Sequence, residues 1–179
     1  MKLILLRHEE RGQHPGFFTS LTNRGLLNSN NLINKIDEHQ PDIIYSSPFL
    51  RTIQTIRPYA LKKNKKIRID YSLYEYIHAS EFNLKNYKHQ VTELDENIYK
   101  DIMDDYKSIL QPDNIKCKEN ENDITSRVYN FLNILKEKHK NQTILIVSHM
   151  STLNIIRKYY NNQITLDSNL PMGSLTILI

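Results

Sequence analysis

The chain has 179 residues, of which 39% are hydrophobic and 25% are charged, and its net charge is +4. This length and balance are typical of a globular protein with its own core, so we expect one domain over residues 1–179. A lone cysteine, Cys117, excludes an internal disulfide framework and fits a reducing compartment. The first apolar run, residues 3–6, is too short for a signal peptide or membrane span, so we expect a cytoplasmic protein without membrane association.

Much of the positive charge lies in one short cluster: Lys62, Lys63, Lys65, Lys66 and Arg68. Such a cluster is either a patch that binds nucleic acid or a solvated helix end before a strand. We favour the solvated helix end, because the cluster is short and no aromatic side chains interleave with it. We therefore expect no nucleic-acid partner.

Strand and helix patterns alternate along most of the chain. Short apolar runs predict strands at residues 3–6, 42–47, 67–69, 143–147 and 174–179. Helical spacing predicts helices from a Thr22 cap to Pro41, after Pro48, from about residue 124 to 140, and from 152 to 160. This alternation predicts an α/β fold with a mainly parallel sheet and helices on both faces.

Residues 71–122 interrupt the alternation and are predicted to form an inserted lid or cap over one edge or face of the sheet. Within them, residues 81–110 show a helical pattern with few turn signals before Pro112. Six tyrosines gather in or near this insertion: Tyr71, Tyr74, Tyr76, Tyr87, Tyr99 and Tyr106. They form either an aromatic lid for substrate or a buried face against the sheet, and we favour the buried face.

Polar side chains follow the predicted strands at the points where the strands end. Arg7 and His8 follow the first strand, His149 follows the strongest strand, and Glu75 follows the third. Arg51 lies in the first turn of the helix after the second strand. An arginine and a histidine alone can simply end a strand at the surface. Matching side chains at several strand ends instead favour a ligand site, since ligands bind outside the carboxyl ends of parallel strands.

The residue types at these strand ends suit a phosphate ester. Guanidinium groups bind phosphate oxygens bidentately, and a helix amino terminus attracts anions. A neutral imidazole can attack phosphorus, and a carboxylic acid can protonate the departing oxygen. No metal or other cofactor is expected, since the arginines and imidazoles supply the positive charge. None of the remaining histidines pairs with another His, Cys or Asp at a spacing typical of a metal site: His14, His39, His78, His89 and His139. His78 is a candidate for the pocket mouth, although a surface position is favoured.

Five short motifs occur in order along the chain: Arg7-His8-Glu9, Leu21-Thr22-Asn23-Arg24-Gly25, Ser47-x-x-x-Arg51-x-x-x-Thr55, Leu73-Tyr74-Glu75 and Val147-Ser148-His149. Each motif alone is weak, but five in this order and in the right strand or helix context are specific. Together they resemble the histidine phosphatase superfamily, also called the phosphoglycerate mutase-like fold. The resemblance spans nearly the whole chain and implies a three-layer sandwich.

The resemblance also implies an activity, that of a metal-independent phosphomonoesterase of the histidine acid phosphatase type. In it, His8 carries the phosphoryl group as phosphohistidine, and Glu75 acts as general acid and then as general base. Arg7, Arg51 and His149 bind the phosphoryl oxygens and offset charge in the transition state. The implied partner is a small-molecule or protein phosphomonoester, and the oligomeric state is left open.

Two other functions are weighed against this one. A cofactor-dependent phosphoglycerate mutase has a longer chain and an Asn- and Trp-bearing loop, whereas this chain has no tryptophan and has His14 there. A non-catalytic phosphate- or protein-binding member of the fold is favoured by Glu9, which replaces the usual glycine. The presence of His8, Glu75 and His149 argues against a pure binder, so phosphatase is preferred.

Two neighbours of the Arg-His pair leave open questions. A Glu9 side chain inside the pocket would repel phosphate, so we expect it to point away. Arg11 has the spacing of a further phosphate-binding arginine found in some phosphatases of this superfamily. It is either a pocket residue or a surface charge of the loop.

Overall fold

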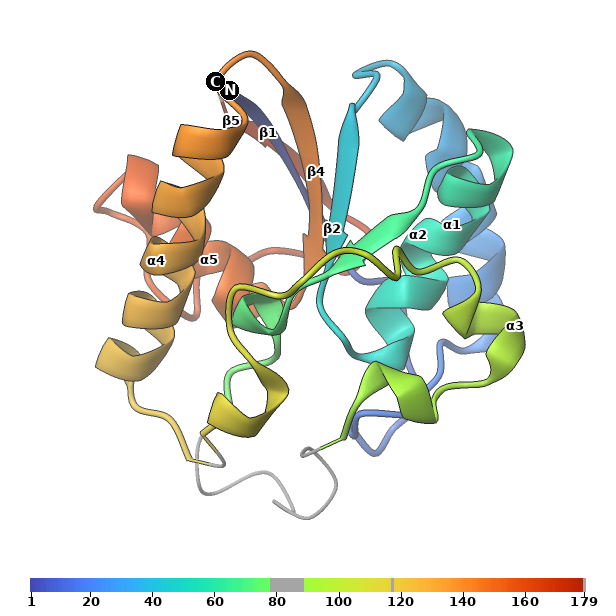
Figure 1. Cartoon of the computed structure of the whole chain (residues 1–179), viewed down its shortest axis with the longest axis horizontal. Coiled ribbons are helices and arrows are strands. Elements are labelled where there is room, and N and C mark those ends of the chain that lie inside the picture. The colour runs from blue at the N-terminus through green and yellow to red at the C-terminus, as the bar shows by residue number, and fades with distance from the viewer. Residues whose placement is uncertain (78–88, 117, 179) are drawn as a thin grey trace.

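The computed structural model describes residues 1–77, 89–116 and 118–178, and a five-stranded sheet lies at its centre. The strands lie side by side in the order β3 (Ile67–Ile69), β2 (Ile43–Ser46), β4 (Thr143–Ser148), β1 (Lys2–Arg7) and β5 (Leu175–Leu178). The first four are parallel, and β5 pairs antiparallel with β1 at one edge (Figure 1). The prediction of a mainly parallel sheet is confirmed.

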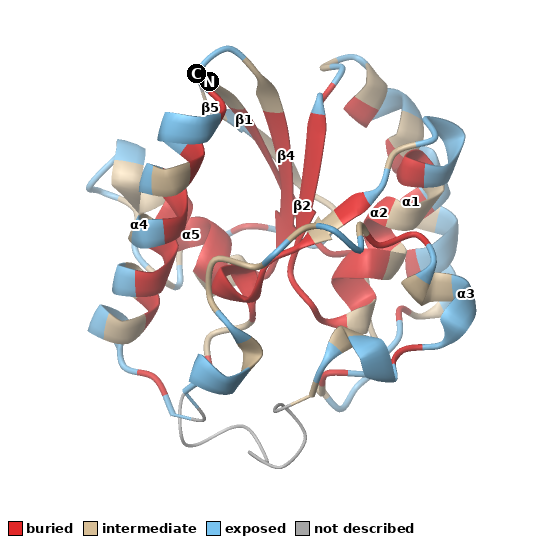
Figure 2. Ribbon diagram, in the orientation of Figure 1, coloured by how far each residue is buried: buried red, intermediate tan, exposed pale blue. Residues whose placement is uncertain are grey.

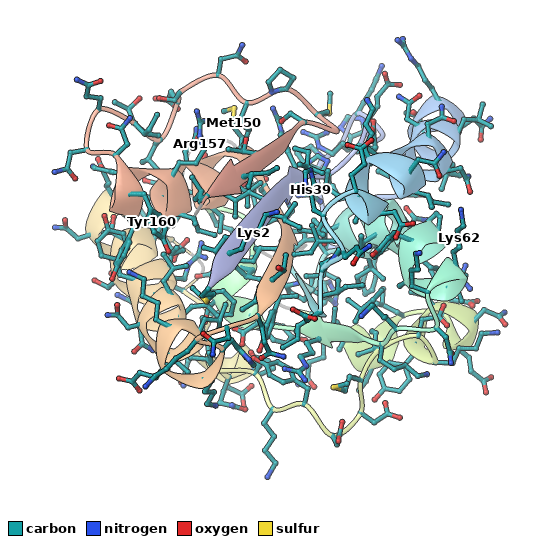
Figure 3. The ribbon with its side chains drawn as sticks, turned by 90° about the horizontal axis from the view of Figure 1, so that it is seen from above. Lys2, His39, Lys62, Met150, Arg157 and Tyr160 are labelled. Atoms are coloured by element: carbon teal, nitrogen blue, oxygen red, sulfur yellow. The ribbon has the colours of Figure 1, made fainter. Side chains whose placement is uncertain are left out.

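Helices cover both faces of this sheet, which gives the predicted three layers. Helices α1 (Asn23–Asp37) and α2 (Leu50–Lys62) lie on one face, and α4 (Glu121–Lys138) and α5 (Met150–Tyr160) lie on the other (Figure 1). Seen from above in Figure 3, Met150, Arg157 and Tyr160 of α5 lie across the sheet from Lys62 of α2. Among the described residues, no helix combines the length and apolar character needed to cross a bilayer.

Strand β1 shows how the core is divided between the two faces. Ile4 and Leu6 pack into the cluster that contains the inner faces of α1 and α2. Leu3 and Leu5 pack into the cluster beneath α4 and α5. Because helices cover both faces, every position of β1 between its end residues, Lys2 and Arg7, is apolar. Figure 2 shows that the central strands are buried.

The start of α1 is fixed against the loop that follows β1. The Thr22 hydroxyl caps the helix by accepting a hydrogen bond from the Gly25 N–H at 3.0 Å, as the sequence predicted. A Cβ at Gly25 would lie 2.2 Å from the Glu10 carbonyl oxygen, so only glycine allows this close approach. The Leu-Thr-x-x-Gly motif therefore packs the helix against the chain just beyond His8.

The prediction of a long helix over residues 81–110 is wrong for residues 89–110. That stretch contains a 3-10 turn, Val91–Glu93, and the one-turn helix α3 (Glu96–Tyr99). The remaining residues 81–88 lie outside the described part of the chain. His78, Tyr87 and Cys117 also lie outside the described residues.

Residues 100–109 form no helix and are held at the edge of the sheet by separate hydrogen bonds. Ile102 forms a parallel bridge with Ile67 of β3. The buried Asp70 carboxylate accepts hydrogen bonds from the Tyr106 hydroxyl at 2.5 Å and from the Ile109 N–H at 2.9 Å. Apolar residues that are spaced as in a helix here serve as separate anchors, and periodicity cannot distinguish the two cases. The preference for buried tyrosines is met at Tyr71 and Tyr74 of this insertion.

Helix α4 begins at Glu121, three residues before the predicted start. Asn120 caps it by accepting a hydrogen bond from the Asp123 N–H, while the Asp123 carboxylate accepts one from the Asn120 N–H. This reciprocal capping box satisfies two backbone donors at the helix end. It fixes the direction in which α4 crosses the sheet.

Candidate active site

Three parallel strands end at the same level and bring their following residues together. The His8 N–H donates to the Ser148 carbonyl at 3.0 Å, and the Ser47 N–H donates to the Val147 carbonyl at 2.9 Å. These two bonds continue the β1–β4 and β2–β4 ladders by one residue. The residues after β1, β2 and β4, among them His149, therefore lie side by side at one edge of the sheet.

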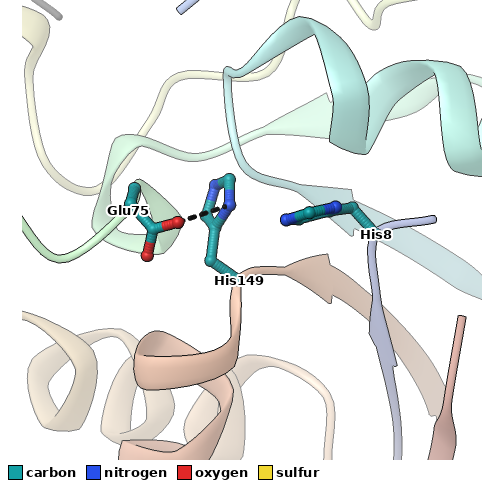
Figure 4. Close-up of side chains that lie close together, drawn as sticks. All are labelled: His8, Glu75 and His149. Carbon is teal, nitrogen blue, oxygen red and sulfur yellow. Dashed lines mark ion pairs between the residues drawn. The ribbon is translucent and has the colours of Figure 1, made fainter. Parts of the chain in front are cut away.

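The structure brings the predicted residues His8, Arg51, Glu75 and His149 into one cluster. The rings of His8 and His149 are 5.3 Å apart between centroids, and Nδ1 of His149 lies 3.2 Å from Oε2 of Glu75 (Figure 4). Arg51 Nη2 is 3.5 Å from the same carboxylate oxygen and 3.3 Å from Nδ1 of His149. Two imidazoles, one carboxylate and one guanidinium therefore share a single site.

His8 is buried in a state suited to a nucleophile. Its Nδ1 lies 2.8 Å from the Glu9 carbonyl oxygen, and since a carbonyl only accepts, the ring proton sits on Nδ1. Burial holds the pKa of His8 well below its ordinary value, and the charge of Arg51 lowers it further. The ring is therefore neutral at neutral pH, with its lone pair on Nε2.

His149 is fully buried and lies between donors and acceptors. Its Nε2 is 2.8 Å from the Ser47 hydroxyl, and its Nδ1 faces both the Arg51 guanidinium and the Glu75 carboxylate. Burial, followed by the charges of Arg51 and of His8, holds its pKa well below the ordinary value. Nδ1 can accept a hydrogen bond from Arg51 or donate one to Glu75, but it cannot do both. Whether the proton of the neutral ring sits on Nδ1 or on Nε2 therefore decides which of the two hydrogen bonds forms.

Arg51 lies in the first turn of α2, as predicted, and is completely buried. Its Nη1 donates to the Gly16 carbonyl at 2.8 Å, and its guanidinium carbon lies 4.6 Å from the centroid of the Phe49 ring. An arginine keeps its charge even when buried, so the site holds a fixed positive charge. The contacts with Gly16 and Phe49 were not found from the sequence, since a carbonyl and a packing ring have no motif of their own.

Arg7 and Arg11 add further positive charge around His8. Arg7 Nη1 donates to the Leu170 carbonyl at 2.5 Å, and burial lowers the pKa of this guanidinium from its usual value. Arg11 Nη1 donates to the Gly12 carbonyl at 2.7 Å within the loop. The charges of both arginines lower the pKa of His8. Arg11 thus acts on the pocket through its charge while its side chain is bonded to the loop.

Glu9 is buried, but its carboxylate contacts residues outside the cluster around His8. The Asn28 side-chain amide donates to Glu9 Oε2 at 3.3 Å. A Cβ at Gly173 would lie 2.0 Å from Glu9 Oε1, and Gly173 has a φ of +69°. The backbone N–H of Glu9 meanwhile donates to the Thr55 hydroxyl at 3.0 Å. Glu9 therefore fills the space that a side chain at position 173 would need.

One group of described residues has donors spaced for a metal ion, namely His8, Glu75 and His149, whose candidate atoms lie within 4.8 Å of one another. The surroundings do not favour a cation, because Arg51 is in contact with two of the three ligands. The charge of Arg7 also acts on both histidines. Fixed positive charge of this kind favours an anion such as a phosphoryl group.

Comparison with known proteins shows the family to which the chain belongs. The family model of the histidine phosphatase superfamily (branch 1) matches residues 4–178. The chain is 27% identical over 158 residues to phosphoserine phosphatase 1 of Hydrogenobacter thermophilus. The aligned region covers 83% of this chain and 71% of that protein. The protein therefore belongs to the histidine phosphatase superfamily, as its motifs predicted, and the matching model is that of branch 1.

Solved structures of phosphatases share the fold. A mutant phosphoserine phosphatase from Entamoeba histolytica, in complex with phosphoserine, has a TM-score of 0.69 at 22% identity and covers 99% of this chain and 90% of its own. A putative alpha-ribazole-5'-P phosphatase from Escherichia coli has a TM-score of 0.68 at 23% identity, with 99% and 89% covered. A mycobacterial glucosyl-3-phosphoglycerate phosphatase with bound VO3 reaches 0.72 at 15% identity, with 99% and 92% covered.

The buried neutral histidines predict a loss of stability in mild acid. Below the ordinary histidine pKa of about 6.5 the unfolded chain binds protons that the folded chain does not. The free energy of unfolding should therefore fall as the pH is lowered from about 7 to about 5.5, by up to about 1.4 kcal/mol per pH unit for each buried histidine. Urea unfolding of the wild type, of His8→Asn and of the control His14→Asn measures this, and an unchanged slope in His8→Asn contradicts it.

The contact between Glu9 and Gly173 predicts coupling between the two positions. Gly173→Ala should destabilise the protein by about 1–3 kcal/mol, because the new methyl group meets the Glu9 carboxylate and the backbone keeps its positive φ. In a Glu9→Gly background only the backbone cost remains, so the same change should cost at least about 0.5 kcal/mol less. Urea unfolding of the two single variants and the double variant measures the difference, and strictly additive effects would show that the two side chains do not compete for space.

Proposed function

We propose that the protein is a metal-independent phosphomonoesterase that acts through a phosphohistidine on His8. The observation that carries this proposal is the state of His8: buried, neutral, and fixed by the Glu9 carbonyl so that Nε2 keeps its lone pair. Glu75 lies in the same cluster and can supply the proton that a departing oxygen needs. No step requires a metal, because arginine side chains supply the positive charge.

The reaction proceeds in two displacements. Arg7, Arg51 and His149 bind the phosphoryl oxygens, and Nε2 of His8 attacks phosphorus as the bond to the ester oxygen breaks. Protonated Glu75 gives its proton to that oxygen, and the alcohol leaves. The Glu75 carboxylate then takes a proton from water, which attacks the phosphohistidine and releases inorganic phosphate with His8 restored.

The names of the relatives guide the choice of substrate. Two of the proteins that the chain resembles are phosphoserine phosphatases, so we propose a small phosphomonoester of an alcohol as the substrate class. Residues 71–122 of the single domain carry Glu75 and are proposed to form the lid that meets the alcohol part. A cytoplasmic location is proposed from the chain's lone cysteine.

The activity is tested by release of inorganic phosphate from p-nitrophenyl phosphate and from phosphoserine in the presence of a metal chelator. We expect full activity with chelator and a loss of at least about 1,000-fold in kcat for His8→Ala, because the nucleophile is gone. His39→Ala, which replaces a histidine two residues beyond the last residue of α1, is the matched control and should keep wild-type activity.

Four other outcomes would contradict the proposal. Loss of activity with chelator would indicate a metal enzyme, and activity that survives His8→Ala would exclude His8 as nucleophile. Fast transfer between 2- and 3-phosphoglycerate that depends on a diphosphoglycerate primer would identify a mutase. Binding of inorganic phosphate without turnover of any ester would identify a non-catalytic member of the fold.

A further inference from the structure

The segment that carries Glu75 is held in place by side chains from other elements. It runs from Ser72 to Glu75 and begins within a short 3-10 turn, Tyr71–Leu73, while Tyr74 and Glu75 lie in no strand or helix. Four consecutive carbonyl groups, of residues 72 to 75, accept hydrogen bonds from three side chains: Arg127 Nη1 to Ser72 at 2.6 Å, Ser148 Oγ to Leu73 at 2.7 Å, Thr152 Oγ1 to Tyr74 at 2.8 Å, and Arg127 Nη2 to Glu75 at 3.4 Å. Arg127 thus holds both ends of the segment.

Arg127 is itself rigidly oriented. Its Nε and Nη2 donate to the two carboxylate oxygens of Glu119 at 2.7 and 2.9 Å. Its guanidinium carbon lies 3.8 Å from the centroid of the Tyr74 ring. Arg127 is 9% exposed and Glu119 is 5% exposed, so water contributes little to holding them. The two hydrogen bonds to Glu119 and the contact with the Tyr74 ring fix the orientation of the guanidinium. In this orientation it donates to backbone carbonyls of the segment that ends at Glu75.

The stability of the fold alone does not require an ion pair at this place. A buried arginine–carboxylate pair contributes little net stability compared with apolar residues of the same volume, because both groups lose their hydration. The pair gives a defined position to a backbone segment whose last two residues, Tyr74 and Glu75, lie in no strand or helix. Catalytic groups lose efficiency when they move by a fraction of an ångström, so this position matters for proton transfer.

We propose that Arg127, oriented by Glu119, is a positioning residue that holds Glu75 where it can protonate the leaving group. This inference rests on the proposed role of Glu75 as general acid. Among the described residues, Arg127 forms no hydrogen bond with a side chain of the cluster around His8, and its hydrogen bond to Glu75 is to the backbone carbonyl. Its charge separately lowers the pKa of His149, and Arg127→Lys, which keeps that charge, distinguishes this effect from the positioning of Glu75.

The experiment compares kcat/KM for a substrate that needs an acid with one that does not. An alkyl phosphate such as glycerol 2-phosphate releases a poor leaving group that must be protonated, whereas p-nitrophenyl phosphate releases a stable phenolate. Since kcat/KM covers the steps up to departure of the leaving group, it includes this proton transfer and excludes hydrolysis of the phosphohistidine, and comparison of the two substrates then singles out the proton transfer. Arg127→Ala should lower kcat/KM for the alkyl phosphate by about 10- to 100-fold and for the aryl phosphate by less than about threefold.

Two further variants sharpen the comparison. Arg127→Lys keeps the charge but has a single donor nitrogen in place of the guanidinium fork, so it should recover part of the alkyl phosphate activity. Arg57→Ala removes an arginine of α2 that is paired with Asp101, and as the matched control it should not change the ratio of the two substrates. The ratio is measured on one sample, so it does not depend on the folded fraction. If Arg127→Ala does not fold, Glu119→Gln, which weakens the same pair, should shift the ratio in the same direction.

The outcomes separate this inference from the proposed function. If Glu75→Gln does not selectively impair the alkyl phosphate, the role of Glu75 as acid is wrong. If Glu75→Gln does so but Arg127→Ala lowers both substrates equally or neither, Glu75 remains the acid and the positioning role of Arg127 is overturned. In the Glu75→Gln background, Arg127→Ala should add no further selectivity.

Discussion

The site depends on the register of three parallel strands. Strands β1, β2 and β4 end at one level, and the hydrogen bonds from His8 to Ser148 and from Ser47 to Val147 carry that register one residue beyond the strands. A shift of one residue along β1 or β4 would turn His8 or His149 away from its neighbours, since successive side chains of a strand face opposite sides. Burial of both faces of the sheet by four helices makes such a shift costly, so the core fixes the geometry of the site.

The same positive charge has two consequences in this pocket. Arg51, buried and bonded to the Gly16 carbonyl, presents a guanidinium suited to a phosphoryl group, and its charge also disfavours protonation of His8 and His149. Desolvation acts in the same direction on both rings. The environment suited to an anionic ester therefore also keeps the His8 imidazole neutral, and the Glu9 carbonyl leaves the ring's lone pair on Nε2.

Much of this arrangement could be predicted from the sequence, because its signals are local. The apolar strands, the Thr22 cap and the polar residues at the strand ends each depend on a few adjacent positions, and together they identified His8, Arg51, Glu75 and His149. Contacts between distant residues left no such signal. The support of the Glu75 segment by Arg127 joins residues 52 positions apart.

Two further features show where local patterns stop. The spacing of apolar residues between 89 and 110 is the same for a helix as for separate anchors, and the ties of Ile102 and Ile109 to the sheet edge decide for the anchors. The environment of Glu9 depends on Gly173, a residue at the other end of the chain whose missing side chain leaves room for the carboxylate.

The most direct test of the account is rapid acid-free quenching of the enzyme with an excess of phosphomonoester, followed by peptide mass spectrometry. It predicts one transient, acid-labile phosphoryl group on Nε2 of His8. A phosphoryl group on another residue, or turnover with none detectable at any time, would contradict it.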